Sequence, residues 1–156
     1  MDLIAHFQGA RNLVVVQAGV PLFNEGEPGK TMYVLMEGSA AVVVAGQVVE
    51  VAGPGALLGE MALVDSSVRS ATAIARSDCR LLPINRTQFD LLVRESPEFA
   101  RHVMTVIAAR LRQMNRRLLE AIYSEPNIRD ILRRKNAAAV ETFGHIQRGS
   151  GGFSRG

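Results

Sequence analysis

A glutamate, an arginine and two glycines within residues 55–73 have the types and spacing needed to bind a phosphate ester. Gly55 and Gly59 permit a tight turn and a close approach of the backbone to a ligand. The five residues that begin with Glu60 favour one turn of helix, whose free N–H groups would face an anion in that turn. Nine positions after Glu60, Arg69 can hold a phosphate through two parallel hydrogen bonds. The segment therefore predicts a phosphate-binding loop.

The acidic residue of this segment requires a different role. A carboxylate repels a phosphate, so Glu60 is suited to accept a hydrogen bond from a sugar hydroxyl, as acidic residues do for ribose in dinucleotide-binding folds. Ser70 adds a hydroxyl beside the arginine. An alternative for the same residues is an ion pair between Glu60 and Arg69 on the protein surface, which would contribute only about 0 to 1 kcal/mol to stability.

The order Gly59-Glu60 and then Arg69-Ser70-Ala71-Thr72 resembles the phosphate-binding cassette of cyclic nucleotide-binding domains, the sensor modules of cAMP receptor proteins, cyclic nucleotide-dependent kinases and cyclic nucleotide-gated channels. The resemblance implies that Glu60 binds the ribose 2′-hydroxyl, that Arg69 binds the cyclic phosphate, and that backbone N–H groups of residues 59–62 complete the cradle. The ligand-binding residues that it implies in the cassette are Gly59, Glu60, Met61, Ala62, Arg69 and Ser70. Many kinase-type cassettes, whose spacing this one shares, have proline before the arginine, where this chain has Val68.

The resemblance continues on both sides of the cassette. The hairpin pattern of the domain is matched by Phe23, Gly26, Glu27, Tyr33-Val34-Leu35 and Gly38. Further along, the resemblance implies that the purine meets a long C-terminal helix near Met114 and Asn115, where cAMP receptor proteins have hydroxyl side chains. Methionine can stack on a base without selecting it, so the preference between cAMP and cGMP stays open.

Short β-rich runs, separated by turns that contain glycine, fill the first half of the chain. They are residues 13–17, 21–23, 31–36, 39–44, 47–51, 71–75 and 79–84. Many short strands at close spacing favour a β-sandwich or roll. The predicted fold class is mainly β with α: a β-roll, or double-stranded jelly roll, over about residues 12–84, flanked by a short N-terminal helix within residues 1–9 and by C-terminal helices.

Helical patterns follow the roll. Asn85 and Gln88 predict a capping box at the start of a helix over about residues 86–95. Ser96-Pro97-Glu98 predicts the start of a long helix over about residues 97–123. Along this helix, steps of four and three match the seam of a two-stranded coiled coil at Ala100, Met104, Ile107, Leu111, Met114, Leu118 and Ala121. The seam predicts a homodimer; packing of the same stripe on the chain's own β-roll is the alternative.

These elements predict a cyclic nucleotide-binding domain over residues 1–123 and a basic C-terminal extension over residues 124–156. The extension is expected to be helical over about residues 127–143 and disordered from Gln147, where Gly, Ser and Arg predominate. Transcriptional regulators with this sensor continue into a winged helix-turn-helix domain, but the extension lacks that pattern, so no sequence-specific DNA binding is expected. The basic residues of the extension are expected to contact a protein effector. RNA binding is a weaker interpretation of its end from Gln147.

Charge is divided unevenly along the 156 residues. Residues 1–80 carry five Lys or Arg against eight Asp or Glu, and residues 81–156 carry thirteen against seven, so the net charges are −3 and +6. This asymmetry indicates either an anionic partner or the solvated face of a long helix. The chain has no run of 18 apolar residues and no basic, apolar leader, so a cytoplasmic protein without a membrane segment is expected.

The residue pattern does not favour catalysis or a metal site. Because Cys79 is the only cysteine, the chain can form no internal disulfide and no cysteine-ligated cluster. The histidines, at positions 6, 102 and 145, lack the spacing of metal ligands. Gly29-Lys30-Thr31 is similar to the end of a P-loop, but Asn24 holds the place of its first glycine and a strand pattern follows. The protein is expected to be no enzyme and to use no cofactor or metal.

The expected function is that of a sensor, which binds cAMP or cGMP and changes the arrangement of its long helix and its dimer. A ligand shifts such an equilibrium only through its different affinities for the two states. Two alternatives stay open. The β-roll could be an interaction scaffold without a ligand, or it could sense another small anion.

Overall fold

The computed structural model describes the backbone of residues 1–148 and the side chains of residues 1–140. The chain forms two compact units, Met1–Ala108 and Ala109–Gly156. The first unit holds all the strands that the structure describes and the short helices, and the division falls within the long helix α4 (Pro97–Ser124). The functional boundary expected after residue 123 stays a prediction.

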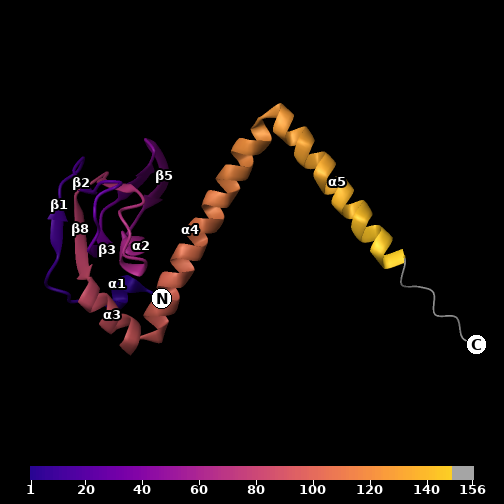
Figure 1. Ribbon diagram of the computed structural model, residues 1–156. Helices are drawn as coiled ribbons and strands as arrows, with labels where there is room; N and C mark the ends of the chain where they lie inside the picture. Colours follow the sequence, from indigo (N-terminus) through magenta and orange to yellow (C-terminus); the bar gives the residue numbers. More distant parts are fainter. Residues whose placement is uncertain (149–156) are drawn as a thin grey trace, which may run out of the picture. The chain divides into compact units, whose positions relative to one another are not determined.

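Within residues 1–148, eight strands form two antiparallel sheets of four (Figure 1). In the first sheet the order is β1-β8-β3-β6, and in the second it is β2-β7-β4-β5. The strands are β1 (Val14–Val16), β2 (Pro21–Phe23), β3 (Thr31–Glu37), β4 (Ala40–Val44), β5 (Gln47–Ala52), β6 (Leu57–Leu58), β7 (Thr72–Ala75) and β8 (Cys79–Asn85). This arrangement confirms the predicted β-roll, and each predicted run contains a strand. The sequence pattern does not predict β6, because two residues are too few to show a period.

The two inner strands of the first sheet, β8 and β3, contribute buried residues to both of its faces. Along β3, Met32 and Val34 belong to a core cluster with helix residues, whereas Leu35 belongs to a second cluster with residues of the opposite sheet. Successive residues of a strand point to opposite faces, which is why one strand serves both clusters. Phe99, near the start of α4, is fully buried in the first cluster. The sheet is therefore held between the other sheet and the helices.

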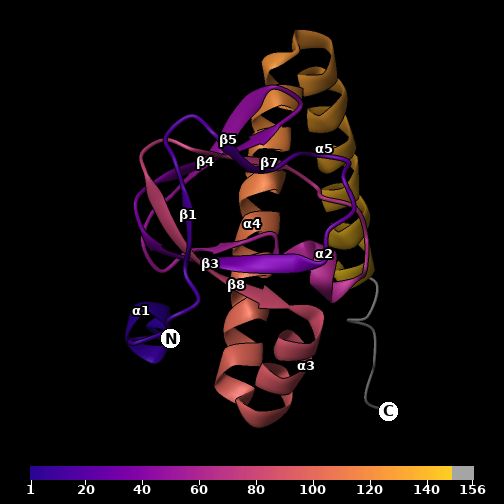
Figure 2. The same ribbon diagram turned by 90° about the vertical axis from the view of Figure 1, so that its left-hand side faces the viewer.

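Side-chain caps fix where two helices of the first unit, α1 and α3, begin. Helix α1 (Leu3–His6) is capped by the Asp2 carboxylate, and α3 (Arg86–Glu95) starts with the predicted capping box. In that box the N–H of Gln88 donates to Asn85 Oδ1 and the N–H of Asn85 donates to Gln88 Oε1, both at 2.9 Å. Helices α1 and α3 lie at the same end of the roll (Figure 1 and Figure 2). The two caps thus fix where the helices at that end of the roll begin.

The second unit consists of the last part of α4 and of α5 (Pro126–Arg148). Helix α4 ends at Ser124 because Pro126 cannot continue its hydrogen-bond ladder. Helix α5 is longer than the predicted helix over residues 127–143. The prediction of disorder from Gln147 is wrong for Gln147 and Arg148, which belong to α5. The rest of that segment, residues 149–156, lies outside the described residues.

Candidate functional site

The predicted phosphate-binding loop is built between β6 and β7. Strand β6 pairs with β3, where Leu58 is the partner of Tyr33, and this pairing fixes the backbone that enters the loop. Gly59 follows with φ of 77°, a left-handed conformation that glycine adopts readily, and caps the one-turn helix α2 (Glu60–Val64). The expected turn of helix after Gly59 is confirmed.

Glu60 and Arg69 are both buried, with exposed fractions of 2% and 6%. They are the two charged residues in the buried class among residues 1–140. Burying a charge is costly unless it is paired or hydrogen-bonded. The alternative of an ion pair on the protein surface is therefore wrong for these two residues.

The Arg69 side chain has defined partners. Its Nη1 donates to the carbonyl oxygen of Gly59 at 3.1 Å, and its Cζ lies 4.3 Å from the centroid of the Phe23 ring. Its backbone N–H donates to the Glu27 carbonyl at 2.8 Å, and its carbonyl accepts from the Gly26 N–H at 2.9 Å. The hairpin loop between β2 and β3 thus fixes the backbone of Arg69, while Gly59 and Phe23 hold its guanidinium.

Burial lowers the pKa of the Arg69 guanidinium below its ordinary value. The nearby carboxylates of Glu27 and Glu60 act in the opposite direction and raise this pKa. Arginine stays protonated in proteins because its ordinary pKa lies far above neutral pH. The site thus holds a partly desolvated cation, which attracts an anion more strongly than the same group would in water.

Two glycines leave the space that this guanidinium fills. A Cβ atom at Gly29 would lie 2.7 Å from Arg69 Nε and 2.7 Å from the Ala62 Cβ. A Cβ atom at Gly59 would contact Arg69 Nη1 and would lie 3.2 Å from Phe23 Cε1. Any larger residue at either position would displace the arginine or the ring.

The bend between α2 and Arg69 is held by local hydrogen bonds. The N–H of Ser67 donates to Asp65 Oδ1 at 3.0 Å, and hydrogen bonds from Ser67 lower the pKa of the Asp65 carboxyl. Ser66 has φ of 57°, and its hydroxyl accepts a hydrogen bond from Arg86 Nη1. Val68, in the place where many kinase-type cassettes have proline, forms an isolated antiparallel bridge with Pro28. The bend is therefore ordered without that proline.

The remaining predicted cassette residues lie around this centre. Ala62 is buried, whereas Met61 and Ser70 are exposed. The Ser70 hydroxyl lies 3.6 Å from the Met61 Sδ, at hydrogen-bonding distance for sulfur. The structure thus brings Gly59, Glu60, Met61, Ala62, Arg69 and Ser70 together in one segment. That these residues bind a ligand stays a prediction.

Met114 and Asn115 belong to the second unit, so the structure does not place them relative to the cassette. Both side chains are exposed on α4. Their contact with a purine stays a prediction.

Further observations concern residues outside the cassette. Thr31, after the P-loop-like Gly29-Lys30, begins a strand and not a helix. Among the residues that the structure describes, no group of three or more His, Cys, Asp or Glu could hold a metal ion, and no helix is long and apolar enough to cross a membrane. The contacts of Phe23 and Gly29 with Arg69 were not predicted, and the hairpin resemblance around Phe23 was the signal that pointed to this loop.

Comparisons with known proteins agree with this geometry. The family model described as the cyclic nucleotide-binding domain matches residues 13–96. A cyclic AMP receptor protein of Thermus thermophilus is 35% identical over 100 residues, which are 61% of this chain and 46% of that protein. A cyclic nucleotide-gated potassium channel of Mesorhizobium japonicum is 41% identical over 85 residues, which are 54% of this chain and 23% of that protein.

A solved structure gives the same result for the fold. The catabolite activator protein of Thermus thermophilus is similar with a TM-score of 0.63 and 29% identity, over 74% of this chain and 62% of that chain. The chain spans less than half the length of the receptor protein and of the channel. Since the family model covers more than half of its residues, this chain belongs to the cyclic nucleotide-binding domain family.

Proposed function

We propose that the protein is a sensor that binds cAMP or cGMP in its β-roll. The observation that carries this proposal is the burial of Glu60 and Arg69 in one short cassette of a chain from the cyclic nucleotide-binding domain family. In a scaffold that binds no ligand, apolar residues at these two positions would stabilise the fold at least as well as buried charges do. A cyclic nucleotide would add a ribose hydroxyl as a hydrogen-bond donor to Glu60 and a phosphate as an acceptor for Arg69.

Each cassette residue has a role in this proposal. Arg69 binds the cyclic phosphate, and the backbone N–H groups of residues 59–62 complete the cradle. A guanidinium carries five N–H groups, so its bond to Gly59 is compatible with a further bidentate contact to phosphate. Glu60 accepts a hydrogen bond from the ribose 2′-hydroxyl. The hydroxyl of Ser70, which is exposed, contacts the phosphate or the purine edge at the border of the site.

The signal passes through helix α4. In this proposal the purine meets α4 near Met114 and Asn115, and the bound state favours one arrangement of the C-terminal helices over another. The ligand shifts this equilibrium only by its different affinity for the two arrangements. The cyclic nucleotide-binding domain then extends to residue 123, and residues 124–156 form the basic extension.

The protein is proposed to form a homodimer through the seam of α4. Four seam residues are exposed on this chain by between 44% and 62%: Met104, Leu111, Met114 and Leu118. A second copy would cover this apolar stripe as in a two-stranded coiled coil. Ile107, another seam position, instead packs against the core of the first unit. The exposed seam residues therefore support packing in a dimer, whereas Ile107 supports packing on the chain's own β-roll.

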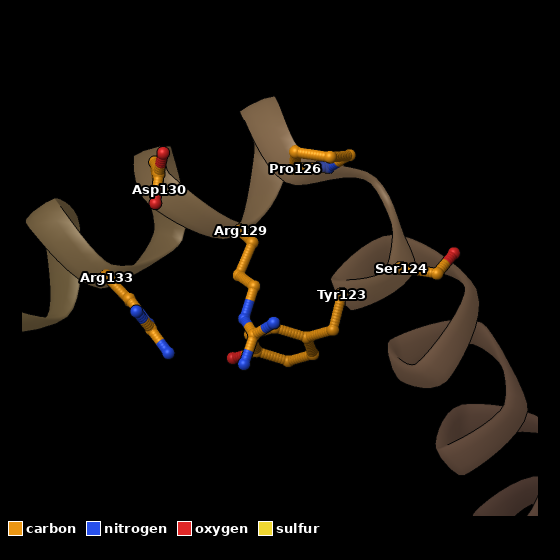
Figure 3. A pocket seen from close by; sticks show the side chains of 6 residues that line it. All are labelled: Tyr123, Ser124, Pro126, Arg129, Asp130 and Arg133. Carbon is orange, nitrogen blue, oxygen red and sulfur yellow. The ribbon is translucent and has the colours of Figure 1, made fainter.

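The second unit offers a surface for an effector. A pocket of about 320 Å³ lies where α4 ends and α5 begins, and it is lined by Tyr123, Ser124, Pro126, Arg129, Asp130 and Arg133. Figure 3 shows Arg129 and Arg133 projecting from α5 toward the side on which Tyr123 projects from α4. Two guanidinium groups one helical turn apart suit an acidic partner. We therefore place the contact with a protein effector here, and the expected cytoplasmic location and the absence of DNA binding stay predictions.

The test is isothermal titration of the full chain with cAMP and with cGMP. We expect a dissociation constant in the micromolar range or tighter for one of them, equivalent to about −8 kcal/mol or better. Arg69→Ala should weaken binding by about 2 to 5 kcal/mol, the range for removing one partner of a buried charge pair. Arg76→Ala, at an arginine whose side chain is exposed, is the matched control and should bind like the wild type.

If Arg69→Ala bound the nucleotide as tightly as the wild type does, the assignment of Arg69 to the cyclic phosphate would be wrong. The absence of binding of both nucleotides would contradict the proposed function and favour a ligand-free scaffold or a sensor of another anion.

A further inference from the structure

We propose that Phe23 is a positioning residue of the ligand site, which holds the Arg69 guanidinium in place for the phosphate. This inference rests on the proposed function, because it assigns a role in that same site. Phe23 lies at the end of β2, where it pairs with Ala73, more than forty residues before the arginine in sequence. Nothing in the cassette motif itself requires an aromatic residue at this position.

The contact between the two side chains is a cation–π interaction. The Arg69 Cζ lies 4.3 Å from the centroid of the Phe23 ring, well within the range of about 6 Å over which the ring face attracts a cation. Arg69 is only 6% exposed, so little water screens this attraction. The ring face therefore fixes the plane in which the guanidinium presents its N–H groups.

The Phe23 ring is itself held from the opposite sheet. Its centroid lies 6.2 Å from that of Tyr33, and the two rings are stacked with an interplanar angle of 16°. Tyr33 belongs to β3 of the first sheet, whereas Phe23 belongs to β2 of the second. The guanidinium, the Phe23 ring and the Tyr33 ring thus form a series of contacts that links both sheets. Phe23 cannot turn its face away without breaking the stack.

The glycine positions close the other sides of the same space. A Cβ atom at Gly59 would contact Arg69 Nη1 and approach Phe23 Cε1, and a Cβ atom at Gly29 would lie 2.8 Å from Arg69 Cζ. The arginine therefore occupies a slot with Phe23 on one side and backbone on others. If the ring were removed, this slot would widen and the guanidinium would sample more orientations.

Preorganisation connects this contact to ligand affinity. A free arginine side chain loses rotamer freedom when it binds a phosphate, and this loss weakens binding. A side chain already fixed by Phe23 loses less. The alternative is that Phe23 only fills space, since it packs against the core cluster between the sheets. If Phe23 only fills space, removal of its ring should lower the stability of the fold but should have no specific effect on nucleotide affinity.

The experiment compares three variants of the full chain. Phe23→Leu keeps an apolar side chain but removes the ring face, Phe23→Tyr keeps the ring, and Phe7→Leu removes a ring from the other core cluster, where Phe7 packs against Phe99. Titration with cAMP and cGMP is combined with a thermal melt of each variant. We expect Phe23→Leu to weaken binding by about five- to thirtyfold, the range of a partly desolvated cation–π contact, and the other two variants to bind like the wild type.

A second measurement reports on the contact without any ligand. In the ¹H–¹⁵N NMR spectrum, the Arg69 Nε–H signal, assigned by its loss in Arg69→Ala, should carry a ring-current shift that Phe23→Leu removes and Phe23→Tyr keeps. An unchanged signal in Phe23→Leu would overturn the inference.

The titration separates this inference from the proposed function. If the wild type binds and Arg69→Ala does not, but Phe23→Leu binds as tightly as the wild type, only the role of Phe23 is wrong. Equal weakening by Phe23→Leu and Phe7→Leu would likewise overturn it, because general destabilisation would then explain the loss. If the wild type binds neither nucleotide, the proposed function and this inference are both wrong.

Discussion

The guanidinium of Arg69 donates a hydrogen bond to the carbonyl oxygen of Gly59, ten residues earlier, over a distance of 3.1 Å. This bond joins the end of the cassette to the turn that starts α2. Because both groups are held by further contacts, the backbone of the turn and the cation are fixed relative to each other before a ligand arrives. A cyclic phosphate bound at this turn would share the guanidinium with the Gly59 carbonyl.

The close approach of Gly29 to Arg69 predicts that Gly29→Ala destabilises the fold. Its Cβ would lie 2.7 Å from Arg69 Nε and from the Ala62 Cβ, and overpacking of this kind costs about 1 to 3 kcal/mol. Urea unfolding should show a lower midpoint. Gly53→Ala is the matched control, because a Cβ there meets nothing within 4 Å and neither glycine has a left-handed φ. Equal midpoints for the two variants would show that Arg69 is not confined at Gly29.

The ribose role of Glu60 predicts discrimination against 2′-deoxy ligands. A hydrogen bond to a charged group contributes about 1.5 to 3 kcal/mol, so the wild type should bind cAMP about ten- to a hundredfold more tightly than 2′-deoxy-cAMP. Glu60→Gln keeps the shape of this buried side chain but removes its charge, and should reduce that ratio. The measurement is the titration of the wild type and of Glu60→Gln with cAMP and with 2′-deoxy-cAMP. Equal affinities of the wild type for the two ligands would argue against the ribose contact.

The seam of α4 predicts that Leu111→Arg dissociates the proposed dimer. Leu111 is 61% exposed on one chain, and a guanidinium there would leave an unpaired charge in a coiled-coil interface. The molar mass should fall from that of two chains to that of one in light scattering coupled to size exclusion. Ala109→Arg adds the same charge to an exposed position off the seam and should stay dimeric. If the wild type itself has the molar mass of one chain, the seam of α4 does not form a dimer.

The half-buried side chain of His102 predicts a stability that falls in mild acid. Burial lowers the pKa of this imidazole below its ordinary value of 6.5. Below that pH the unfolded chain takes up the proton while folded His102 resists it, so stability decreases as the pH falls from 6.5 toward the folded pKa. The urea midpoint of the wild type should drop between pH 7.5 and pH 5.5, and the drop should be smaller in His102→Gln. An identical drop in both proteins would assign the pH dependence to other groups.

The sequence by itself determined the parts of this protein that depend on neighbours in the chain. The capping box of Asn85 and Gln88 and the start of α4 after Ser96 involve groups three residues apart, so local pattern is sufficient. The same holds for the strands, whose apolar runs and turns predict a β-roll, and for the one-turn helix after Gly59. The spacing of Glu60 and Arg69 identified the cassette because both residues lie in one segment.

Only the tertiary structure decided which distant groups meet at that cassette. Phe23 reaches Arg69 because β2 pairs with β7, Tyr33 stacks on Phe23 from the other sheet, and the short β6 exists because Leu57 and Leu58 have β3 as a partner. The burial of Arg69 likewise depends on its contacts with the hairpin loop between β2 and β3 and has no local signal. Periodicity reports the face of an element but not its neighbour, and the neighbours here are set by the pairing of strands far apart in the chain.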